Sequence, residues 1–235
     1  MPREQLLAVI LQLAVVDCEQ LRGGLLAQPA NSLSSLTFVV AGVWILGRAR
    51  RHITNVDAIA VGLAAVAVGI GSFAFHGVAD APSHWMHDTT LLVLLALVAV
   101  KHVGPRALSV ARAAPMMGAG AGGFVLASPN STTLVAIMLV LCVGAGEVVG
   151  TLRHGARIIP RSLAVMLGVG LFAAWLGRTG SVLCRPESAL QLHALWHVVM
   201  AVATVWWVEC AIFSTPEAGA ATARSGTSEA VSARR

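Results

Sequence analysis

Long apolar runs joined by short polar connections restrict the fold of this chain more than any other feature. The chain has 235 residues, of which 57% are hydrophobic and only 11% are charged. A helix needs about 20 predominantly apolar residues to cross the hydrocarbon core of a bilayer, and several runs approach that length. A soluble core would not need so many runs with so little charge between them. The composition therefore predicts an all-α integral membrane protein.

Hydropathy divides residues 1–213 into a seven-transmembrane-helix bundle. The predicted spans are Leu33–Leu46, Ala58–Phe75, Thr89–Val103, Ala113–Ala127, Leu134–Gly150, Leu163–Leu176 and Leu190–Phe213. The amphipathic segment Arg3–Val16 is expected to form an interfacial helix. A signal peptide is the alternative, although Asp17, Cys18 and Glu19 would make a poor cleavage site. Residues 214–235 are rich in small and charged residues and are predicted to be a disordered cytoplasmic tail.

The basic residues predict the orientation of the bundle, because Lys and Arg concentrate in cytoplasmic loops. Twelve of them fall on one side of the seven spans and four on the other. The twelve are Arg48, Arg50, Arg51, Lys101, Arg106, Arg112, Arg153, Arg157, Arg161, Arg224, Arg234 and Arg235, and the four are Arg3, Arg22, Arg178 and Arg185. The amino terminus is therefore expected outside and the carboxyl terminus in the cytoplasm.

The composition also bears on partners and source. Basic residues are scattered singly between apolar segments rather than clustered with exposed aromatic residues, which argues against a nucleic-acid partner. Arginine is strongly preferred over lysine, and Ala, Gly and Val are abundant. This bias is typical of a GC-rich bacterial genome and favours the bacterial plasma membrane as the location.

Histidines at helical spacing are the strongest functional signal. Ser72 and His76 are four residues apart, as are His193 and His197, so each pair shares one face of a helix. Ionisable groups at membrane depth are costly and mark candidate functional sites. The predicted topology brings both pairs and Asp88 to the outer half of the bundle. Because catalytic zinc typically takes three protein ligands and keeps one open position, His76, His193 and His197 are predicted to bind zinc.

The remaining polar residues suggest roles around such a metal. Asp88 is expected to take and return a proton, and Ser72 to donate a hydrogen bond to a developing oxyanion. His84 and His87, in the loop before Asp88, are expected to line the site, the alternative being that one is itself a ligand. Any single histidine could instead be a satisfied interhelical hydrogen-bonding group.

Two further ionisable groups fall at the other side of the predicted membrane. His102 lies in a basic connection and is expected to be solvated or to face lipid headgroups. Glu147 lies inside the fifth predicted span, where a hydrogen bond between packed helices or snorkelling towards the inner surface is favoured over a direct functional role.

The motifs around these residues resemble those of the alkaline ceramidase family. That family belongs to a superfamily of seven-span metal-dependent hydrolases that also includes progestin and adiponectin receptors. Gly-Ile-Gly-Ser72-Phe-Ala-Phe-His76 is similar to the serine and first histidine of the family, and His193-Ala-Leu-Trp-His197 to its closing pair. The resemblance implies that His76, His193 and His197 are zinc ligands, with Ser72 and Asp88 beside the metal.

The resemblance extends to the amino-terminal side, where ceramidases bind calcium near the zinc. Asp17, Glu19 and Asn31 are the candidate calcium ligands here. Gln28 stands where an acid is expected and Leu21 where another oxygen ligand is expected, and the alternative for Asp17 and Glu19 is an interfacial helix cap or a solvated charge. The resemblance also implies a disulfide between Cys18 and Cys184, on the outer face where oxidation is permitted.

The leading functional hypothesis is a zinc-dependent lipid amidohydrolase that acts on ceramide or a related N-acyl lipid. An ester would need the same parts, so the sequence does not separate amide from ester hydrolysis. The second hypothesis is a non-enzymatic seven-span sensor or receptor-like protein with a structural zinc. A transporter is the third hypothesis. A transporter would need ionisable residues at several depths across the membrane, whereas those of this chain are predicted to gather at one depth.

Overall fold

The chain folds into a bundle of long helices in the computed structural model, which describes residues 17–51, 55–104, 109–155 and 157–214. The α-helices in these residues are α2 (Pro29–Arg50), α3 (Val56–Val78), α4 (Ala81–Val103), α5 (Val110–Ala127), α6 (Thr132–His154), α7 (Arg161–Leu176) and α8 (Leu192–Val208). A 3₁₀ turn, η1 (Pro129–Ser131), precedes α6, and α8 continues into a π-helical turn, η2 (Glu209–Phe213). The interfacial helix predicted over Arg3–Val16 lies outside the described residues, as do residues 215–235 of the disordered tail predicted over 214–235.

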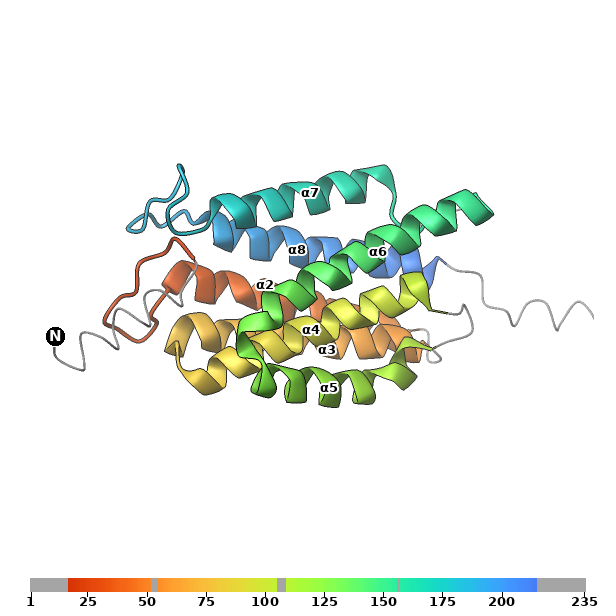
Figure 1. Ribbon diagram of the computed structural model, residues 1–235, viewed down its shortest axis with the longest axis horizontal. Helices are drawn as coiled ribbons and strands as arrows, with labels where there is room; N and C mark the ends of the chain where they lie inside the picture. The colour runs from red at the N-terminus through yellow and green to blue at the C-terminus, as the bar shows by residue number, and fades with distance from the viewer. Residues whose placement is uncertain (1–16, 52–54, 105–108, 156, 215–235) are drawn as a thin grey trace, which may run out of the picture.

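Successive helices run in opposite directions along the long axis of the molecule, with α6 slanting across its neighbours (Figure 1). One end of the bundle holds the last turn of α3 and the first turns of α2, α4 and α8. We call it the histidine end, after His76, His193 and His197. The other end holds the last turn of α2 and the first turn of α7, and we call it the arginine end, after Arg48, Arg51 and Arg161.

Six of the described helical segments are long and apolar enough to cross a membrane, which indicates an integral membrane protein. Large apolar side chains point outwards from these helices, as lipid contact requires. They include Val40, Val43, Leu63, Ile70, Leu134, Ile137, Leu141, Val202 and Trp206. The segment predicted as the sixth span, α7, has 16 residues and is therefore about 24 Å long at a rise of 1.5 Å per residue. It is an apolar helix shorter than a full span.

The connection between α3 and α4 differs from the prediction. Sequence reasoning placed His84 and His87 in a loop, and this was wrong, because α4 begins at Ala81 and carries both histidines. Asp80 starts the helix by accepting a hydrogen bond from the Ser83 backbone, while the Ser83 hydroxyl accepts one from the Asp80 N–H. Hydrogen bonding by the Ser83 side chain and backbone lowers the pKa of the exposed Asp80 carboxyl. Asp80 is thus a cap for α4.

Helices α2, α3, α4 and α8 form the centre of the bundle. A Cβ atom at Gly42 of α2 would lie 2.6 Å from the Gly62 carbonyl oxygen of α3, so glycine allows these two backbones to approach closely. The buried apolar cluster between the central helices includes Phe38, Ile45, Val61, Val68, Leu97, Ala201, Trp207 and Val208. This rigid centre fixes the positions of the polar groups at both ends.

A polar cluster inside the bundle, towards the arginine end, contains His102. His102 was predicted to be solvated or to face lipid headgroups, and this was wrong. Its side chain is fully buried rather than solvated. The Trp207 indole N–H donates to His102 Nε2 over 3.0 Å, and His102 Nδ1 lies 3.4 Å from a Glu147 carboxylate oxygen. The other Glu147 oxygen accepts a hydrogen bond from the Ile159 backbone. This cluster joins α4, α6 and α8, which is the helix-packing role favoured for Glu147.

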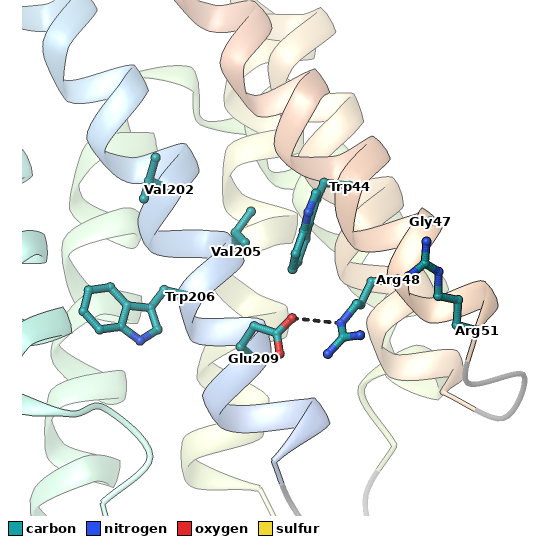
Figure 2. A pocket seen from close by; sticks show the side chains of 8 residues that line it. All are labelled: Trp44, Gly47, Arg48, Arg51, Val202, Val205, Trp206 and Glu209. Atoms are coloured by element: carbon teal, nitrogen blue, oxygen red, sulfur yellow. Dashed lines mark hydrogen bonds and ion pairs between the residues drawn. The ribbon is translucent and has the colours of Figure 1, made fainter.

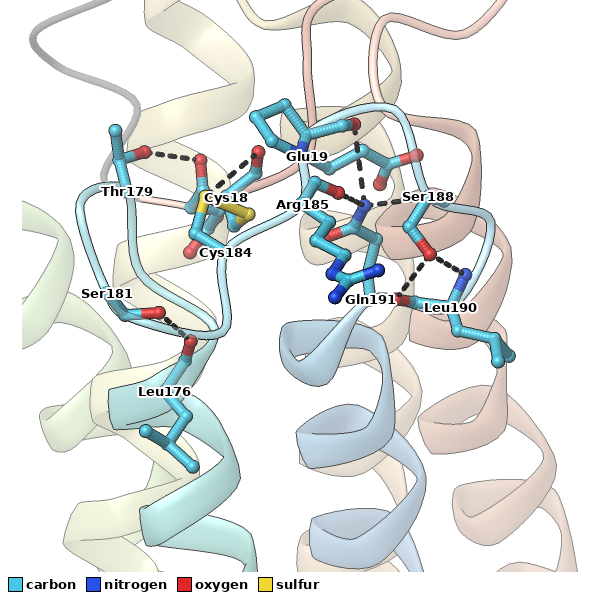
Figure 3. Close-up of a disulfide and its surroundings, with 12 residues drawn as sticks. Cys18, Glu19, Leu176, Thr179, Ser181, Cys184, Arg185, Ser188, Leu190 and Gln191 are labelled. Atoms are coloured by element: carbon cyan, nitrogen blue, oxygen red, sulfur yellow. Dashed lines mark hydrogen bonds between the residues drawn. A yellow bond between two sulfur atoms is a disulfide. The ribbon is translucent and has the colours of Figure 1, made fainter.

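A disulfide between Cys18 and Cys184 ties the segment before α2 to the connection between α7 and α8 (Figure 3). Beside it, the Cys18 N–H donates to the Gly177 carbonyl, and the Thr179 hydroxyl donates to the Asp17 carbonyl. Gly177 is needed here, since a Cβ atom would lie 2.6 Å from the His193 backbone nitrogen. These links place Asp17 next to the first turn of α8.

Removing the disulfide is expected to destabilise the histidine end. The Cys18→Ser, Cys184→Ser double variant should lose about 2–4 kcal/mol of unfolding free energy, because the bond closes a long loop. Thermal unfolding of detergent-solubilised protein measures the loss. The matched control is Cys142→Ser, Cys210→Ser, which removes the two free cysteines. Equal melting temperatures for the two double variants would contradict a stabilising role for the bond.

Candidate metal centre

Three imidazoles from two helices meet at the histidine end. His76 lies in the last turn of α3, and His193 and His197 lie on one face of the first turns of α8. One ring nitrogen from each lies within 4.8 Å of the others, so the three residues could hold a metal ion. His76 and His197 are each only 1% exposed, and His193 is partly exposed. A buried imidazole nitrogen without a hydrogen-bond partner is costly unless a ligand satisfies it.

Each of the three imidazoles is held through its Nδ1 atom. His76 Nδ1 donates to Gln28 Oε1 over 2.7 Å, since a carbonyl oxygen can only accept. His193 Nδ1 lies 3.0 Å from an Asp17 carboxylate oxygen, and His197 Nδ1 lies 2.9 Å from Ser34 Oγ.

The Ser34 hydroxyl gives its proton to the Asn31 carbonyl, so its oxygen accepts from the His197 Nδ1–H. All three rings are therefore in the tautomer that leaves Nε2 free to accept a metal. Metal-binding histidines usually have such an oxygen partner on the other ring nitrogen.

The Nε2 atom of His76 shows whether a metal would fit this site. His76 Nε2 is buried and makes no hydrogen bond, although buried polar nitrogens are nearly always satisfied. Its ring centroid lies 5.2 Å from the centroids of both His193 and His197. Three neutral imidazoles with oriented rings suit zinc, so the residues present fit the predicted metal.

Ser72 lies beside the three histidines, where the sequence placed it. Its hydroxyl is 2.8 Å from Ser35 Oγ and 3.4 Å from His197 Nε2. The Ser35 hydroxyl donates to the Asn31 carbonyl, so the short contact between the serines is a hydrogen bond from Ser72 to Ser35. To donate to an oxyanion, the Ser72 hydroxyl would therefore have to rotate away from Ser35.

Asp88 is buried about two turns inside α4 and has two histidine partners. His87 Nδ1 donates to Asp88 over 2.8 Å, and His84 Nε2 lies 3.3 Å from the other carboxylate oxygen. The Phe75 ring lies against both imidazoles. Among the described residues, neither a hydrogen bond nor an ion pair joins Asp88 directly to His76, and the His87 ring, which contacts Asp88, lies 6.2 Å from that of His76.

The three candidate calcium ligands have different surroundings. Both Glu19 carboxylate oxygens accept backbone N–H groups of α2, from Ala30 and Asn31, each over 2.8 Å. Glu19 therefore caps the start of α2 and places negative charge at the positive end of the α2 dipole. Asp17 faces His193, and the Asn31 side chain is buried with neither polar atom hydrogen-bonded. Calcium binding stays a prediction.

Sequence reasoning missed the residues that orient the imidazoles. Gln28 was considered only as a departure from a calcium site, and Ser34 and Ser35 were given no role. The sequence did indicate that these residues face the inside of the bundle, because they are polar residues at the start of an apolar helix, where a lipid-facing position would be apolar. Asp17 was assigned to calcium, whereas its carboxylate faces His193.

Replacing Gln28 tests whether the hydrogen bond to His76 Nδ1 contributes to metal affinity. Gln28→Leu is expected to weaken metal binding about 10- to 100-fold, because His76 loses the partner that fixes its ring. Gln28→Glu keeps an acceptor and should retain tight binding. The control is Gln20→Leu, at an exposed position. Competition with a zinc chelator measures the affinities, and equal values for Gln28→Leu and Gln20→Leu would contradict this role.

Models of known protein families and curated protein sequences provide no match to this chain.

Proposed function

We propose that this chain is an intramembrane zinc-dependent hydrolase of the alkaline ceramidase type. Its substrate would be a lipid amide, ceramide or a related N-acyl lipid, cleaved to a fatty acid and an amine. The observation that carries the proposal is the arrangement of His76, His193 and His197, whose Nδ1 atoms are held and whose Nε2 atoms are left for a metal. The motifs around Ser72 and His197 that resemble ceramidases support the reaction class.

Zinc bound by these imidazoles would supply a Lewis acid for the carbonyl and a water of lowered pKa. The coordination expected for a catalytic site leaves a fourth position open, whereas a structural site is closed by protein ligands. Ser72 lies at the His197 side of the group, where its hydroxyl can turn from Ser35 to a developing oxyanion.

Asp88 is the proposed proton carrier. Hydrolysis adds water across the amide: the C–N bond breaks, the hydroxyl stays on the carbonyl carbon, and one proton must reach the leaving nitrogen. The Asp88 carboxylate can accept that proton and return it, and His84 and His87 hold it in place. His87 bonds to Asp88, and its ring lies 6.2 Å from that of His76, so His87 is a candidate to pass the proton to Asp88.

The sides of the bundle support access from the bilayer. Helix α6 packs on α4 and α7 packs on α8, with little contact between α6 and α7. Both helices carry exposed large apolar side chains, including Ile137, Leu141, Val169 and Phe172. A lipid substrate would enter laterally between these helices. The proposed setting is a bacterial plasma membrane, with seven spans, the histidine end outside and the carboxyl terminus in the cytoplasm.

A screen of lipid amides and lipid esters tests the proposal. Purified wild-type protein in detergent is incubated with each lipid, with zinc and after chelation, beside His76→Ala. The expected result is zinc-dependent release of fatty acid from at least one amide by wild type and none by the variant. Absence of metal-dependent product from every lipid would contradict the proposal and favour the sensor with a structural zinc.

A further inference from the structure

A groove lies between α2 and α8 at the arginine end, far from the three histidines (Figure 2). The two helices run parallel, because Ser34 contacts His197 near one end and Arg48 contacts Glu209 near the other. The groove has a volume of about 800 Å³. It is lined by Trp44, Gly47, Arg48, Arg51, Val202, Val205, Trp206 and Glu209. No part of the proposed hydrolase chemistry uses these residues.

The lining changes from apolar to charged along the helix axes. On α2, Trp44 precedes Arg48 by one turn, and on the α8 side Val205 precedes Glu209 by one turn, so each pair shares a helix face. The deeper part of the groove therefore offers Trp44, Val202 and Val205, and the part at the end of the bundle offers charges. Tryptophan is enriched at this depth of membrane proteins, where one side meets acyl chains and the other meets headgroups.

The charged part of the groove has an excess of positive charge. Arg48 Nε lies 3.3 Å from a Glu209 carboxylate oxygen, and this pair neutralises itself. Arg51 also lines the groove, and no ion pair involves it among the residues that the structure describes. Arg50 adds a second exposed cation in the same last turn of α2. An anion at the mouth of the groove would meet this unneutralised charge.

Gly47 keeps the groove open on the α2 side. A Cβ atom at this position would meet nothing within 4 Å, so the space in front of Gly47 is free. The residue lies between Trp44 and Arg51 on the lining of the groove. A larger side chain there would fill the groove without changing any charge, which provides a steric test separate from the electrostatic one.

We propose that this groove binds a phospholipid with an anionic headgroup from the adjoining leaflet. One acyl chain would lie along Trp44, Val202 and Val205, and the phosphate would lie at Arg51 and the outer side of Arg48. Basic pockets between membrane helices favour such headgroups, because an anionic lipid combines apolar burial with charge pairing. The bound lipid would join α2 to α8, the helices that carry Ser34 and His197 at the histidine end.

Native mass spectrometry of the full chain in detergent tests this site. The probes are phosphatidylglycerol, phosphatidylcholine of the same acyl chains, and free glycerol phosphate. Phosphatidylglycerol is expected to bind more tightly than phosphatidylcholine, and glycerol phosphate is not expected to compete. Arg51→Gln should weaken phosphatidylglycerol binding about fivefold, since each arginine near an anionic lipid contributes about that factor.

Two further variants keep the test decisive if the removal of charge disturbs the fold. Gly47→Leu should also weaken phosphatidylglycerol binding, whereas Arg161→Gln, at the same end but outside this groove, should leave it unchanged. Wild-type binding by both Arg51→Gln and Gly47→Leu would overturn the proposal, as would equal binding of the two lipids. Lipid binding is measured without any substrate, so its failure is distinguishable from failure of the proposed hydrolase activity.

Discussion

The double variant His193→Ala, His197→Ala is expected to lose its metal. Purified wild-type protein should contain about one zinc per chain, and the variant close to none, because one remaining imidazole cannot hold zinc against solvent. The two residues provide two of the three ring nitrogens that lie within 4.8 Å of one another. Elemental analysis of protein purified without added chelator measures the metal directly.

The matched control is His84→Ala, His87→Ala, a second pair of histidines at the same end of the bundle. Their ring nitrogens face the Asp88 carboxylate, so the zinc content should stay at the wild-type value. Loss of zinc from the control but not from His193→Ala, His197→Ala would move the metal to α4. Unchanged zinc in both would contradict a site built on histidine.

The second large effect is expected at Asp88. Asp88→Asn should lower kcat for lipid amide hydrolysis about 10²- to 10⁴-fold, the range that a positioned general acid or base contributes. Zinc content should be unchanged, because the Nδ1–H groups of the three ligand imidazoles donate to Gln28, Asp17 and Ser34 rather than to Asp88. Steady-state rates with a lipid amide, beside elemental analysis, separate the two roles.

Asp80→Asn is the control for Asp88, since Asp80 is the nearest other acid and caps α4 at an exposed position. Its activity should stay near that of the wild type, because asparagine is also a good helix cap. A large loss of activity in Asp80→Asn with full activity in Asp88→Asn would exchange their roles. Loss of zinc from Asp88→Asn would instead make Asp88 part of the metal centre.

Local spacing was enough to predict that the three histidines lie at the same end of the bundle. His193 and His197 are one helical turn apart, and the apolar runs around them allowed alternating helices to be assigned, which brought His76 to the same end. The helices α2 to α8 each contain most of a predicted span, although only six of the described segments have the length and composition to cross a membrane. The spacing of the histidines and the length of the apolar runs therefore predict the order of the helices, because both are local properties of the chain.

Helix boundaries were less predictable, for a physical reason. The span after Asp88 was started at Thr89 because His84 and His87 lower the local hydropathy, and a connection of two residues, between Val78 and Ala81, was interpreted as a long loop. The cap that begins α4 at Asp80 depends on Ser83 and not on hydropathy. The same bias started the first span at Leu33, so the buried polar residues Asn31 and Ser32, which α2 contains, fell outside that span.

Contacts between distant residues could not be read from local patterns. Gln28 meets His76 across 48 positions, and Ser34 meets His197 across 163. Each depends on helix packing that the sequence does not encode in any short window. The same holds for His102, whose basic neighbours suggested solvent, whereas Trp207 and Glu147 enclose it.

Zinc K-edge X-ray absorption of the purified protein tests the central claim most directly, because it reports the ligands and the open position together. The predicted result is four-coordinate zinc with three imidazole nitrogens at about 2.0–2.1 Å and one oxygen at a similar distance. The imidazole signal should fall in His76→Ala. Sulfur ligands, fewer than three imidazoles, or a fourth protein ligand that closes the site would contradict a catalytic zinc held by His76, His193 and His197.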